Sequence, residues 1–462
     1  MNDFMRKLVL DSKAGTLENF KPLPKTKNEP LYAQTGLTQD EFRDLYPKIP
    51  VKNVFFDDTI TGQSLVYWDS ENFVLSYMHI FHGGQRFAFN NESNDVFSDR
   101  LLRVAKEAIE QRKNKEYGRL LYPFSDAIRI DIMNRLLEED GPSKELCNAF
   151  ISWYKCSDYG FGNLDINKVI DLMKYLPEEE QKTSDSVLKA LPDTITIYRG
   201  EGSKSTPYTK AMSWTLDPNV ALWYGSRFER EDVRLISGTC KKEDVLFAYD
   251  SEDSDKELLV CASEIQNIKV EHQYGMEIIE DFSLMEYYHQ YRDKLVSDLR
   301  VYYENSNSHS ALHVARVLLL SLLIADNNER MLTDGELKKL CLAAIYHDIG
   351  RRNDTRDKNH GMRGAEIYKK LEKVPAASVE WLIAYHDKSD EAAKKALTNI
   401  ATSQKSRESY WMLYEILKDA DALDRVRFPV SSKDSLDIRM LRRPQSKDMY
   451  AVAMSVFEEI TL

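Results

Sequence analysis

The spacing of apolar and polar residues changes twice along the chain. Up to residue 97, short apolar runs predict β-strands in VKNVFFDD, SLVYWDS, NFVLSYMHIF and QRFAF, with turns at TGQS and HGGQ. From about residue 96 to 190, apolar residues recur at helical spacing and predict several helices, separated by DGPS and SDYGFGN. Strand-like alternation then returns in DTITIYRGEG, KAMSWT and DKELLVCASEIQNIKV, with a helix predicted after DPN.

Helical spacing dominates from residue 280 onward. Residues 280–307 predict a long helix, HVARVLLLSLLIA a buried one, and DMYAVAMSVFEEITL a terminal amphipathic one. Thr333 and Glu336 form a capping-box signature before a further apolar stripe. The pattern predicts an α+β multidomain protein with three parts: an α/β segment of unknown role (residues 1–97), a mixed domain (98–280) and an all-α domain (281–462).

Side chains suited to metal binding gather in the predicted all-α domain. Five of the nine histidines lie between residues 309 and 386. Together with aspartates they form an ordered set: His313, His347, Asp348, His360, His386 and Asp421. Imidazole and carboxylate together suit Mn, Fe, Co, Ni or Zn, and helices that converge could bring them to one place. His309 could replace or join His313, and Asp419 or Asp424 could replace Asp421.

This set resembles the HD superfamily of metal-dependent phosphohydrolases. The resemblance rests on the His347-Asp348 doublet followed by Ile349-Gly350, with His313 before it and Asp421 far behind. His360 and His386 resemble the subset with two metals, such as HD-GYP phosphodiesterases, although the GYP signature is absent.

The resemblance implies a division of ligands between two ions. One ion would be held by His313, His347, Asp348 and Asp421, and the other by Asp348, His360 and His386, with Asp348 bridging. Arg351 stands where a lysine often follows the HDIG run and would face phosphate. Two divalent ions can activate water and neutralise a phosphoryl group. The expected reaction is hydrolysis of a phosphate ester or anhydride in a nucleotide-type substrate.

A second constellation lies in the mixed domain. Arg199 ends a predicted strand beside Gly200, a position suited to bind phosphate while the backbone approaches closely. Ser213 and Thr215 lie on one face of the short strand in KAMSWT, and Glu257 lies in DKELLV. This order of Arg, Ser-x-Thr and Glu resembles ADP-ribosyltransferases related to bacterial and phage arginine-type transferases, over roughly residues 100–275.

The resemblance implies a split β-sandwich with a helical lobe, NAD as co-substrate, and a protein or nucleic-acid acceptor. Glu257 would stabilise the oxocarbenium-like ribose when the nicotinamide bond breaks. Arg199 would hold the pyrophosphate, and Ser213 would fix Glu257 or the nicotinamide ribose. Thr215 would support the strand, and Tyr224 or Phe228 could stack on nicotinamide.

The match to the transferase pattern has departures. Asp255 stands where the family usually has Glu or Gln, which leaves the acceptor open, and Trp214 occupies a position where a smaller residue is common. Glu264 is an alternative to Glu257, which we prefer because the apolar LLV follows it directly. His79 and His82 lack a nearby third ligand and are interpreted as strand histidines.

Composition and charge limit the compartment and the partners that we expect for this protein. A formal net charge of −12 argues against a chain-wide nucleic-acid surface, and the basic cluster of Arg439, Arg442, Arg443 and Lys447 is interpreted as a solvated face. Five cysteines without a C-x-x-C pair suit a reducing compartment. The longest mostly apolar stretch, residues 317–325, is too short to span a membrane. We expect a cytoplasmic protein without membrane contact.

The sequence therefore predicts a bifunctional enzyme that transfers ADP-ribose and hydrolyses a phosphorylated nucleotide. One alternative is a hydrolase regulated by a degenerate domain that only senses a nucleotide. A further alternative is a binding protein without turnover.

Overall fold

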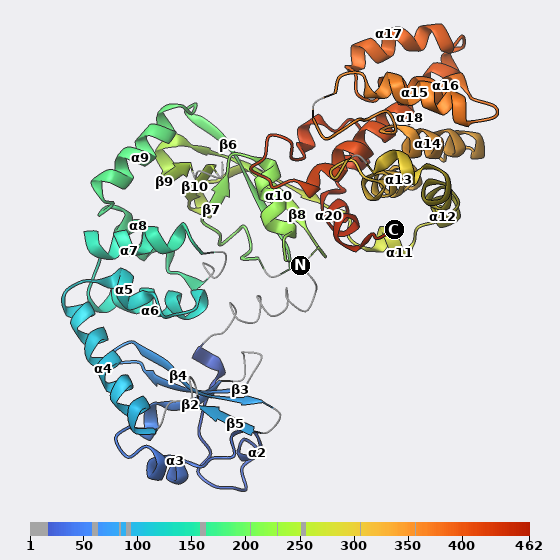
Figure 1. The fold of residues 1–462 in the computed structure, drawn as a ribbon. Helices are drawn as coiled ribbons and strands as arrows, with labels where there is room; N and C mark the ends of the chain where they lie inside the picture. Colours follow the sequence, from blue (N-terminus) through green and yellow to red (C-terminus); the bar gives the residue numbers. More distant parts are fainter. Residues whose placement is uncertain are drawn as a thin grey trace.

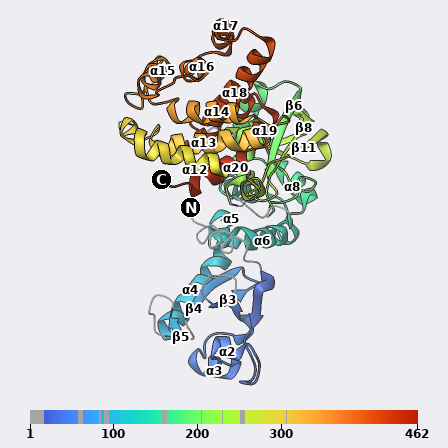
Figure 2. The same ribbon diagram turned by 90° about the vertical axis from the view of Figure 1, so that its right-hand side faces the viewer.

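A computed structural model of the 462-residue chain describes residues 17–57, 63–82, 85–88, 94–157, 163–203, 205–228, 230–250, 256–304, 306–355 and 357–462. Figure 1 shows a small sheet at one end, a run of helices, a second sheet, and a helical C-terminal part at the other end. Figure 2 shows the same succession from the side. The expected combination of sheets in the N-terminal half and helices in the C-terminal part is confirmed.

The first sheet is an antiparallel meander in the order β1-β2-β3-β4-β5. Its strands are β1 (Phe20–Pro22), β2 (Val54–Asp57), β3 (Gln63–Asp69), β4 (Val74–His82) and β5 (Gln85–Ala88). Two short helices, α2 (Tyr32–Thr35) and α3 (Gln39–Leu45), connect β1 and β2. The four strands predicted from the apolar runs are confirmed. His79 and His82 lie on β4, and their side chains lie outside the described part of the chain.

Six helices lie between the two sheets along the sequence. They are α4 (Asn94–Lys113), α5 (Tyr117–Leu121), α6 (Asp126–Glu139), α7 (Lys144–Tyr154), α8 (Ile166–Met173) and α9 (Glu178–Lys189). Apolar side chains of β2 to β4 share one core with those of α4 to α8. The predicted boundary after residue 97 falls within α4.

The second sheet is antiparallel and has the order β11-β8-β6-β7-β10-β9. Its strands are β6 (Thr194–Glu201), β7 (Ser213–Thr215), β8 (Arg234–Lys241), β9 (Val245–Asp250), β10 (Lys256–Val260) and β11 (Gln266–His272). One residue pair, Tyr198 with Thr215, joins β6 to β7, so two three-stranded halves meet at this point. Where we expected a split β-sandwich, the hydrogen bonds thus define one sheet that is nearly divided.

Two details of this sheet differ from the prediction. The stretch from residue 255 to 270, interpreted as one strand-like run, forms β10 and β11 at separate places in the sheet, with a 3₁₀ turn (Ala262–Glu264) between them. Strands β8 and β9 were not predicted. Helix α10 (Pro218–Ser226) packs across β6 and β8.

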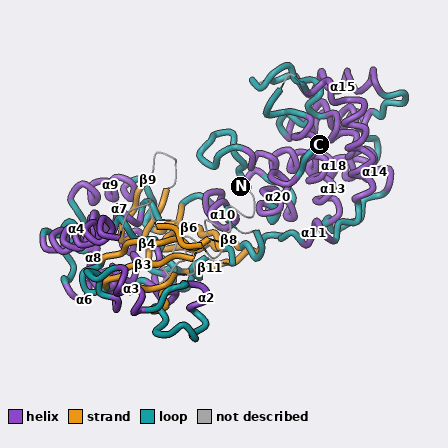
Figure 3. The backbone as a smooth tube through the Cα atoms, turned by 60° about the horizontal axis from the view of Figure 1, so that its bottom comes forward, coloured by secondary structure: helices purple, strands orange, loops and turns teal. Residues whose placement is uncertain are grey.

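The C-terminal part is helical. It contains α11 (Glu277–Glu280), α12 (Met285–Lys294), α13 (Ala311–Asp326), α14 (Asp334–Tyr346), α15 (His360–Leu371), α16 (Ala377–Tyr385), α17 (Asp390–Ile400), α18 (Gln404–Leu423), α19 (Pro444–Lys447) and α20 (Tyr450–Glu459). Figure 3 shows that the strands stay outside this part. The capping box of Thr333 and Glu336 is confirmed. The helix predicted over residues 280–307 is confirmed in part: it starts at Met285 as α12 and continues as a π-helical segment (Leu295–Leu299) and a 3₁₀ segment (Arg300–Tyr303).

The second sheet and the C-terminal helices are joined through α10. Ala221 and Leu222 of α10 belong to the same apolar core as the helices α13 to α20. The Asn219 side-chain oxygen accepts a hydrogen bond from the Ile438 backbone N–H at 2.8 Å. Arg230 pairs with Glu458 of α20 at 2.7 Å. None of the helices in the described residues is both long and apolar enough to cross a bilayer.

Candidate functional site

The predicted metal ligands come from the ends of five helices. His313 lies in the first turn of α13, His347 and Asp348 directly follow α14, and His360 opens α15. His386 follows α16, and Asp421 lies in the last turn of α18. All are buried except Asp421, whose side chain is 34% exposed. The structure brings the six residues together.

Asp348 lies at the centre of this cluster. Its Oδ1 is 3.1 Å from His360 Nε2 and 3.5 Å from His386 Nε2. Its Oδ2 is 3.6 Å from His313 Nε2 and 3.8 Å from His347 Nε2. Each carboxylate oxygen therefore faces a different pair of imidazoles. Asp421 Oδ1 completes the second group, at 3.4 Å from His313 Nε2.

The hydrogen bonds behind the imidazoles fix their tautomers. Nδ1 of His347, His360 and His386 contacts a backbone carbonyl oxygen at 2.6 to 2.7 Å. A carbonyl oxygen only accepts, so each Nδ1 carries the proton and each Nε2 points a lone pair inward. His347 Nε2 lies 3.3 Å from His313 Nε2, and His360 Nε2 lies 3.0 Å from His386 Nε2. When both imidazoles of a pair are neutral, these lone pairs face each other and a divalent cation between them would remove their repulsion, so the residues fit a metal site.

His313 is oriented by a carboxylate behind it. Its Nδ1 donates to Asp424 Oδ2 at 2.7 Å, and Asp424 is fully buried. Arg427 donates to the same oxygen at 3.0 Å, and Arg316 also donates to this carboxylate. A carboxylate on the far nitrogen of a histidine is the usual support of a metal ligand.

The protonation states of the cluster differ from one residue to the next. Burial lowers the pKa of His347 to about 4, so its imidazole is neutral near pH 7 and can coordinate. Burial alone would raise the pKa of Asp348, but the surrounding imidazoles outweigh it and hold the pKa of this carboxyl well below its usual range. Hydrogen bonds to the surrounding aspartates outweigh burial and raise the pKa of His313 to about 10, and Asp348 raises the pKa of His386, so these two imidazoles would release a proton when a metal binds.

The structure also shows where the alternative ligands His309, Asp419 and Asp424 lie. His309 Nδ1 lies 2.7 Å from Asp348 Oδ2, so His309 joins the cluster beside His313. Asp419 accepts from the backbone N–H groups of Arg442 and Arg443, and Asp424 lies behind His313. Asp421 is therefore the aspartate of α18 that faces the imidazoles. Arg351 Nε lies 3.0 Å from Asp348 Oδ2, at the cluster.

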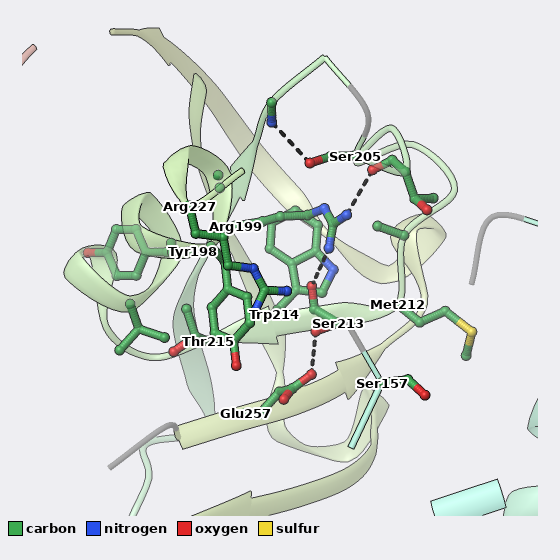
Figure 4. Close-up of a pocket in the computed structure, with 18 of the residues that line it drawn as sticks. Ser157, Tyr198, Arg199, Ser205, Met212, Ser213, Trp214, Thr215, Arg227 and Glu257 are labelled. Atoms are coloured by element: carbon green, nitrogen blue, oxygen red, sulfur yellow. Dashed lines mark hydrogen bonds between the residues drawn. The ribbon is translucent and has the colours of Figure 1, made fainter. Parts of the chain in front are cut away.

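The second predicted constellation lines a cavity of about 180 Å³ in the second sheet. Its lining comes from the end of α7, the end of β6 and the loop after it, β7, α10, β9 and β10. Figure 4 shows Arg199, Ser213, Thr215 and Glu257 around this cavity. Cys156, after α7, also lines it and is the exposed one of the five cysteines.

Three hydroxyl groups hold the Glu257 carboxylate. Its Oε1 accepts from the hydroxyls of Ser213 and Tyr154, the latter at 2.6 Å, and its Oε2 accepts from Tyr249 at 2.6 Å. Burial raises the pKa of Tyr154 well above its usual value, so its hydroxyl keeps its proton and donates. We did not predict either tyrosine, because Tyr154 has the helical spacing of a core residue and Tyr249 lies on a strand that was missed.

The terminal nitrogens of the Arg199 guanidinium already donate to other groups of the protein. Its two terminal nitrogens donate to the backbone oxygens of Ser213 at 3.0 Å and Thr206 at 2.8 Å. Its Nε lies 3.5 Å from the buried Glu201 carboxylate. At Gly200, a Cβ would lie 1.7 Å from the Ala221 carbonyl oxygen, so α10, and not a ligand, makes the close approach predicted there.

The other residues predicted for the transferase site do not all line the cavity. Tyr224 and Phe228 line the cavity and flank the guanidinium of Arg227, an arginine that we did not predict. The Thr215 hydroxyl accepts from the Asp217 backbone N–H at 3.2 Å, at the start of α10. Glu264 is exposed in the turn before β11 and does not line the cavity. Asp255 lies outside the described residues.

Comparison with known protein families finds one match. Residues 311–426 match the family model described as "HD: HD domain", a segment that contains all six predicted ligands. No curated protein and no solved structure matches the chain. The match and the cluster together support an HD domain with a metal site in this part of the chain.

Proposed function

We propose that the HD domain of residues 311–426 hydrolyses a phosphate ester, diester or anhydride of a nucleotide-type substrate. An HD domain implies a metal-dependent phosphohydrolase. The observation that supports two ions is the position of Asp348, whose two oxygens face different groups of imidazoles. Divalent ions of Mn, Fe, Co, Ni or Zn, when bound, supply an activated water and charge neutralisation.

The residues at this metal centre would have different roles. His313, His347, Asp348 and Asp421 would hold one ion, and Asp348, His360 and His386 the other. Asp424 fixes the orientation of His313. Arg351, beside Asp348, would neutralise charge on the phosphoryl group of the substrate.

Elemental analysis and a nucleotide-hydrolysis screen, with and without added Mn, test this proposal. We expect about two ions per wild-type chain, and loss of both metal and hydrolysis in Asp348→Ala. Asp434→Ala, at an exposed position of the same helical part, is the matched control. Hydrolysis that survives in Asp348→Ala would contradict the proposal.

We further propose that the cavity of the second sheet transfers ADP-ribose from NAD to a protein or nucleic-acid acceptor. The observation that supports this is the Glu257 carboxylate, held by Ser213 and two tyrosines at the cavity. The nicotinamide–ribose bond would break with its electron pair leaving on nicotinamide, and Glu257 would stabilise the cationic ribose. A nucleophile of the acceptor would then bond to the ribose carbon and lose its proton.

Labelled NAD tests the second proposal. Wild type should release nicotinamide and label an acceptor, Glu257→Gln should do neither, and Glu264→Gln should behave as wild type. If neither wild type nor Glu257→Gln acts on NAD with any acceptor, the transferase proposal fails. The alternative is then a nucleotide sensor that regulates the HD domain, which the packing of α10 against α20 favours.

A further inference from the structure

We infer that strand β11 pairs with β11 of a second copy of this chain, antiparallel and across a two-fold axis. The second sheets of the two copies would then form one continuous sheet. The surface lies outside both candidate sites, because β11 contributes no residue to the metal cluster or to the lining of the cavity. The inference therefore stands apart from the proposed hydrolase and transferase.

The two edges of the second sheet differ. At one edge, α9 covers β9, and the Ser184 hydroxyl accepts a hydrogen bond from the Ala248 backbone N–H at 2.9 Å. The other edge is β11, which pairs with β8 alone among the described strands (Figure 2). All seven residues of β11 are exposed, among them Ile268 and Val270. An exposed edge strand offers backbone groups to which another strand can bind.

The pairing with β8 determines which backbone groups of β11 point outward. One residue beyond β11, the Gln273 N–H donates to the Val233 backbone oxygen at 2.8 Å. Hydrogen-bonded and non-hydrogen-bonded pairs alternate in an antiparallel ladder, so Lys269 and Glu271 are the residues bonded to β8. The backbone groups that point away from the sheet therefore belong to Ile268, Val270 and His272.

The open part of this edge is short. Before Lys269 the register with β8 shifts, and Asn267 has a φ of 53°, which marks a bulge. After His272, the Tyr274 N–H donates to the Asp448 backbone oxygen at 2.7 Å, so the chain before α20 covers the edge there. The segment that can accept a partner strand is residues 268–272.

This segment is complementary to itself. With Val270 opposite Val270 of the second copy, Lys269 of each copy lies opposite Glu271 of the other. These charged pairs fall at non-hydrogen-bonded positions, where opposing side chains are closest. Ile268 then lies opposite His272, and the exposed surface of Ile268 and Val270 is covered. A shift by two residues in either direction would place Lys269 or Glu271 opposite itself, so charge selects this one register.

Both charges are available for a partner. In the part of the chain that the structure describes, neither Lys269 nor Glu271 forms an ion pair with another side chain. Glu271 lies near Asp448, and burial together with Glu271 raises the pKa of Asp448 to about 6. A lysine of the second copy would bring a positive charge to this acidic place. Because the pairing uses the same edge of both copies, it closes as a dimer and does not continue into a fibre.

Sedimentation velocity of the full chain tests the inference. We expect wild type to show an equilibrium between monomer and dimer. Val270→Pro removes an N–H that points outward and none that bonds to β8, so this variant should keep the circular dichroism spectrum of wild type and lose the dimer. Wild type that stays monomeric up to about 200 μM overturns the inference.

Charge exchange tests the register. Lys269→Glu alone, or Glu271→Lys alone, sets like charges opposite each other at both pairs and should weaken the dimer about tenfold or more. A mixture of these two variants should form a dimer again, because opposite charges then meet at every pair. Lys174→Glu, at an exposed position of α8, makes the same change in charge and should dimerise as wild type does.

Two further results would overturn the inference. A dimer that Val270→Pro and Lys269→Glu leave unchanged must use another surface. A mixture of the two charge variants that stays monomeric shows that these residues do not face each other across a two-fold axis.

Discussion

Glu257 is oriented by side chains from three different elements. Ser213 and Tyr249 hold it from the neighbouring strands β7 and β9, and Tyr154 holds it from α7. The prediction that Arg199, Ser213 and Glu257 lie together came from the resemblance of their order to the transferase pattern. The tyrosines could not be predicted, because neither helical spacing nor strand alternation indicates where a hydroxyl at the end of an aromatic ring will lie.

Removal of one hydroxyl tests this arrangement. In Tyr154→Phe, we expect kcat for NAD cleavage to fall about tenfold, the effect of one hydrogen bond to a charged group, with KM changed less than about twofold. Steady-state kinetics with NAD measure both. Tyr117→Phe, which removes a hydroxyl bonded to Asp140 at 3.1 Å, is the matched control. An equal loss in both variants would indicate a general structural effect.

The elements that could be predicted are those whose signals are local. The capping box of Thr333 and Glu336 and the apolar stripe of α14 are examples. Strands β8 and β9 were missed, because each contains consecutive buried residues and so lacks the strict alternation that indicates a strand. The helix predicted from residue 280 starts only at Met285, after Ser283, whose backbone N–H donates to the distant Asp326. No local pattern shows such a contact.

The contact between α10 and β6 requires glycine at position 200. In Gly200→Ala, the added carbon would meet the Ala221 carbonyl oxygen at 1.7 Å, so α10 must shift. We expect a loss of about 1–3 kcal/mol in the free energy of unfolding, the usual cost of overpacking. Urea denaturation measures it. At Gly335, in α14, a Cβ has no neighbour within 4 Å, so Gly335→Ala should be neutral or stabilising. Unchanged stability of Gly200→Ala would contradict the tight contact.

The stability that Glu336 contributes at the start of α14 should depend on pH. Burial alone would raise the pKa of Glu336, but hydrogen bonds from Arg330, Ser409 and Thr333 outweigh it and lower the pKa to about 2. The folded state therefore favours the ionised carboxylate, which contributes stability above the ordinary pKa of 4.5 and loses it as the pH falls toward 2.

The pH dependence of Glu336→Gln tests this. The difference in the free energy of unfolding between wild type and Glu336→Gln should be largest above pH 5 and shrink as the pH falls toward 3. Denaturant titrations at several pH values measure it. Glu178→Gln, at an exposed position of α9, provides the comparison. A difference that is constant over this range would show that the charge of Glu336 is not the cause.

The whole molecule joins two candidate sites through one apolar core. Helix α10, which lines the cavity, packs on α20, and both share the core of the C-terminal helices. From α20, Phe457 contacts the guanidinium of Arg316, which donates to Asp424 behind His313. The metal ligands could be predicted from residue type and from the resemblance of their order to HD domains, but this connection could not, because it depends on how distant segments pack.

Metal binding should therefore also stabilise elements outside the HD domain. A ligand that binds only the folded state stabilises it, so chelation with EDTA should lower the midpoint of thermal unfolding. It should also speed amide hydrogen exchange in α10 as well as α13, and leave α4, which belongs to another core, unchanged. Hydrogen-exchange mass spectrometry measures this. If hydrogen exchange in α10 is unchanged after chelation, the two sites are not energetically coupled.

One further consequence follows from Cys156. Because the other four thiols are buried, a maleimide dye should attach at this position, without any engineered change. The dye would report from the rim of the cavity, and its fluorescence would follow the arrival of a ligand in real time. The natural chain thus carries its own attachment point for a sensor.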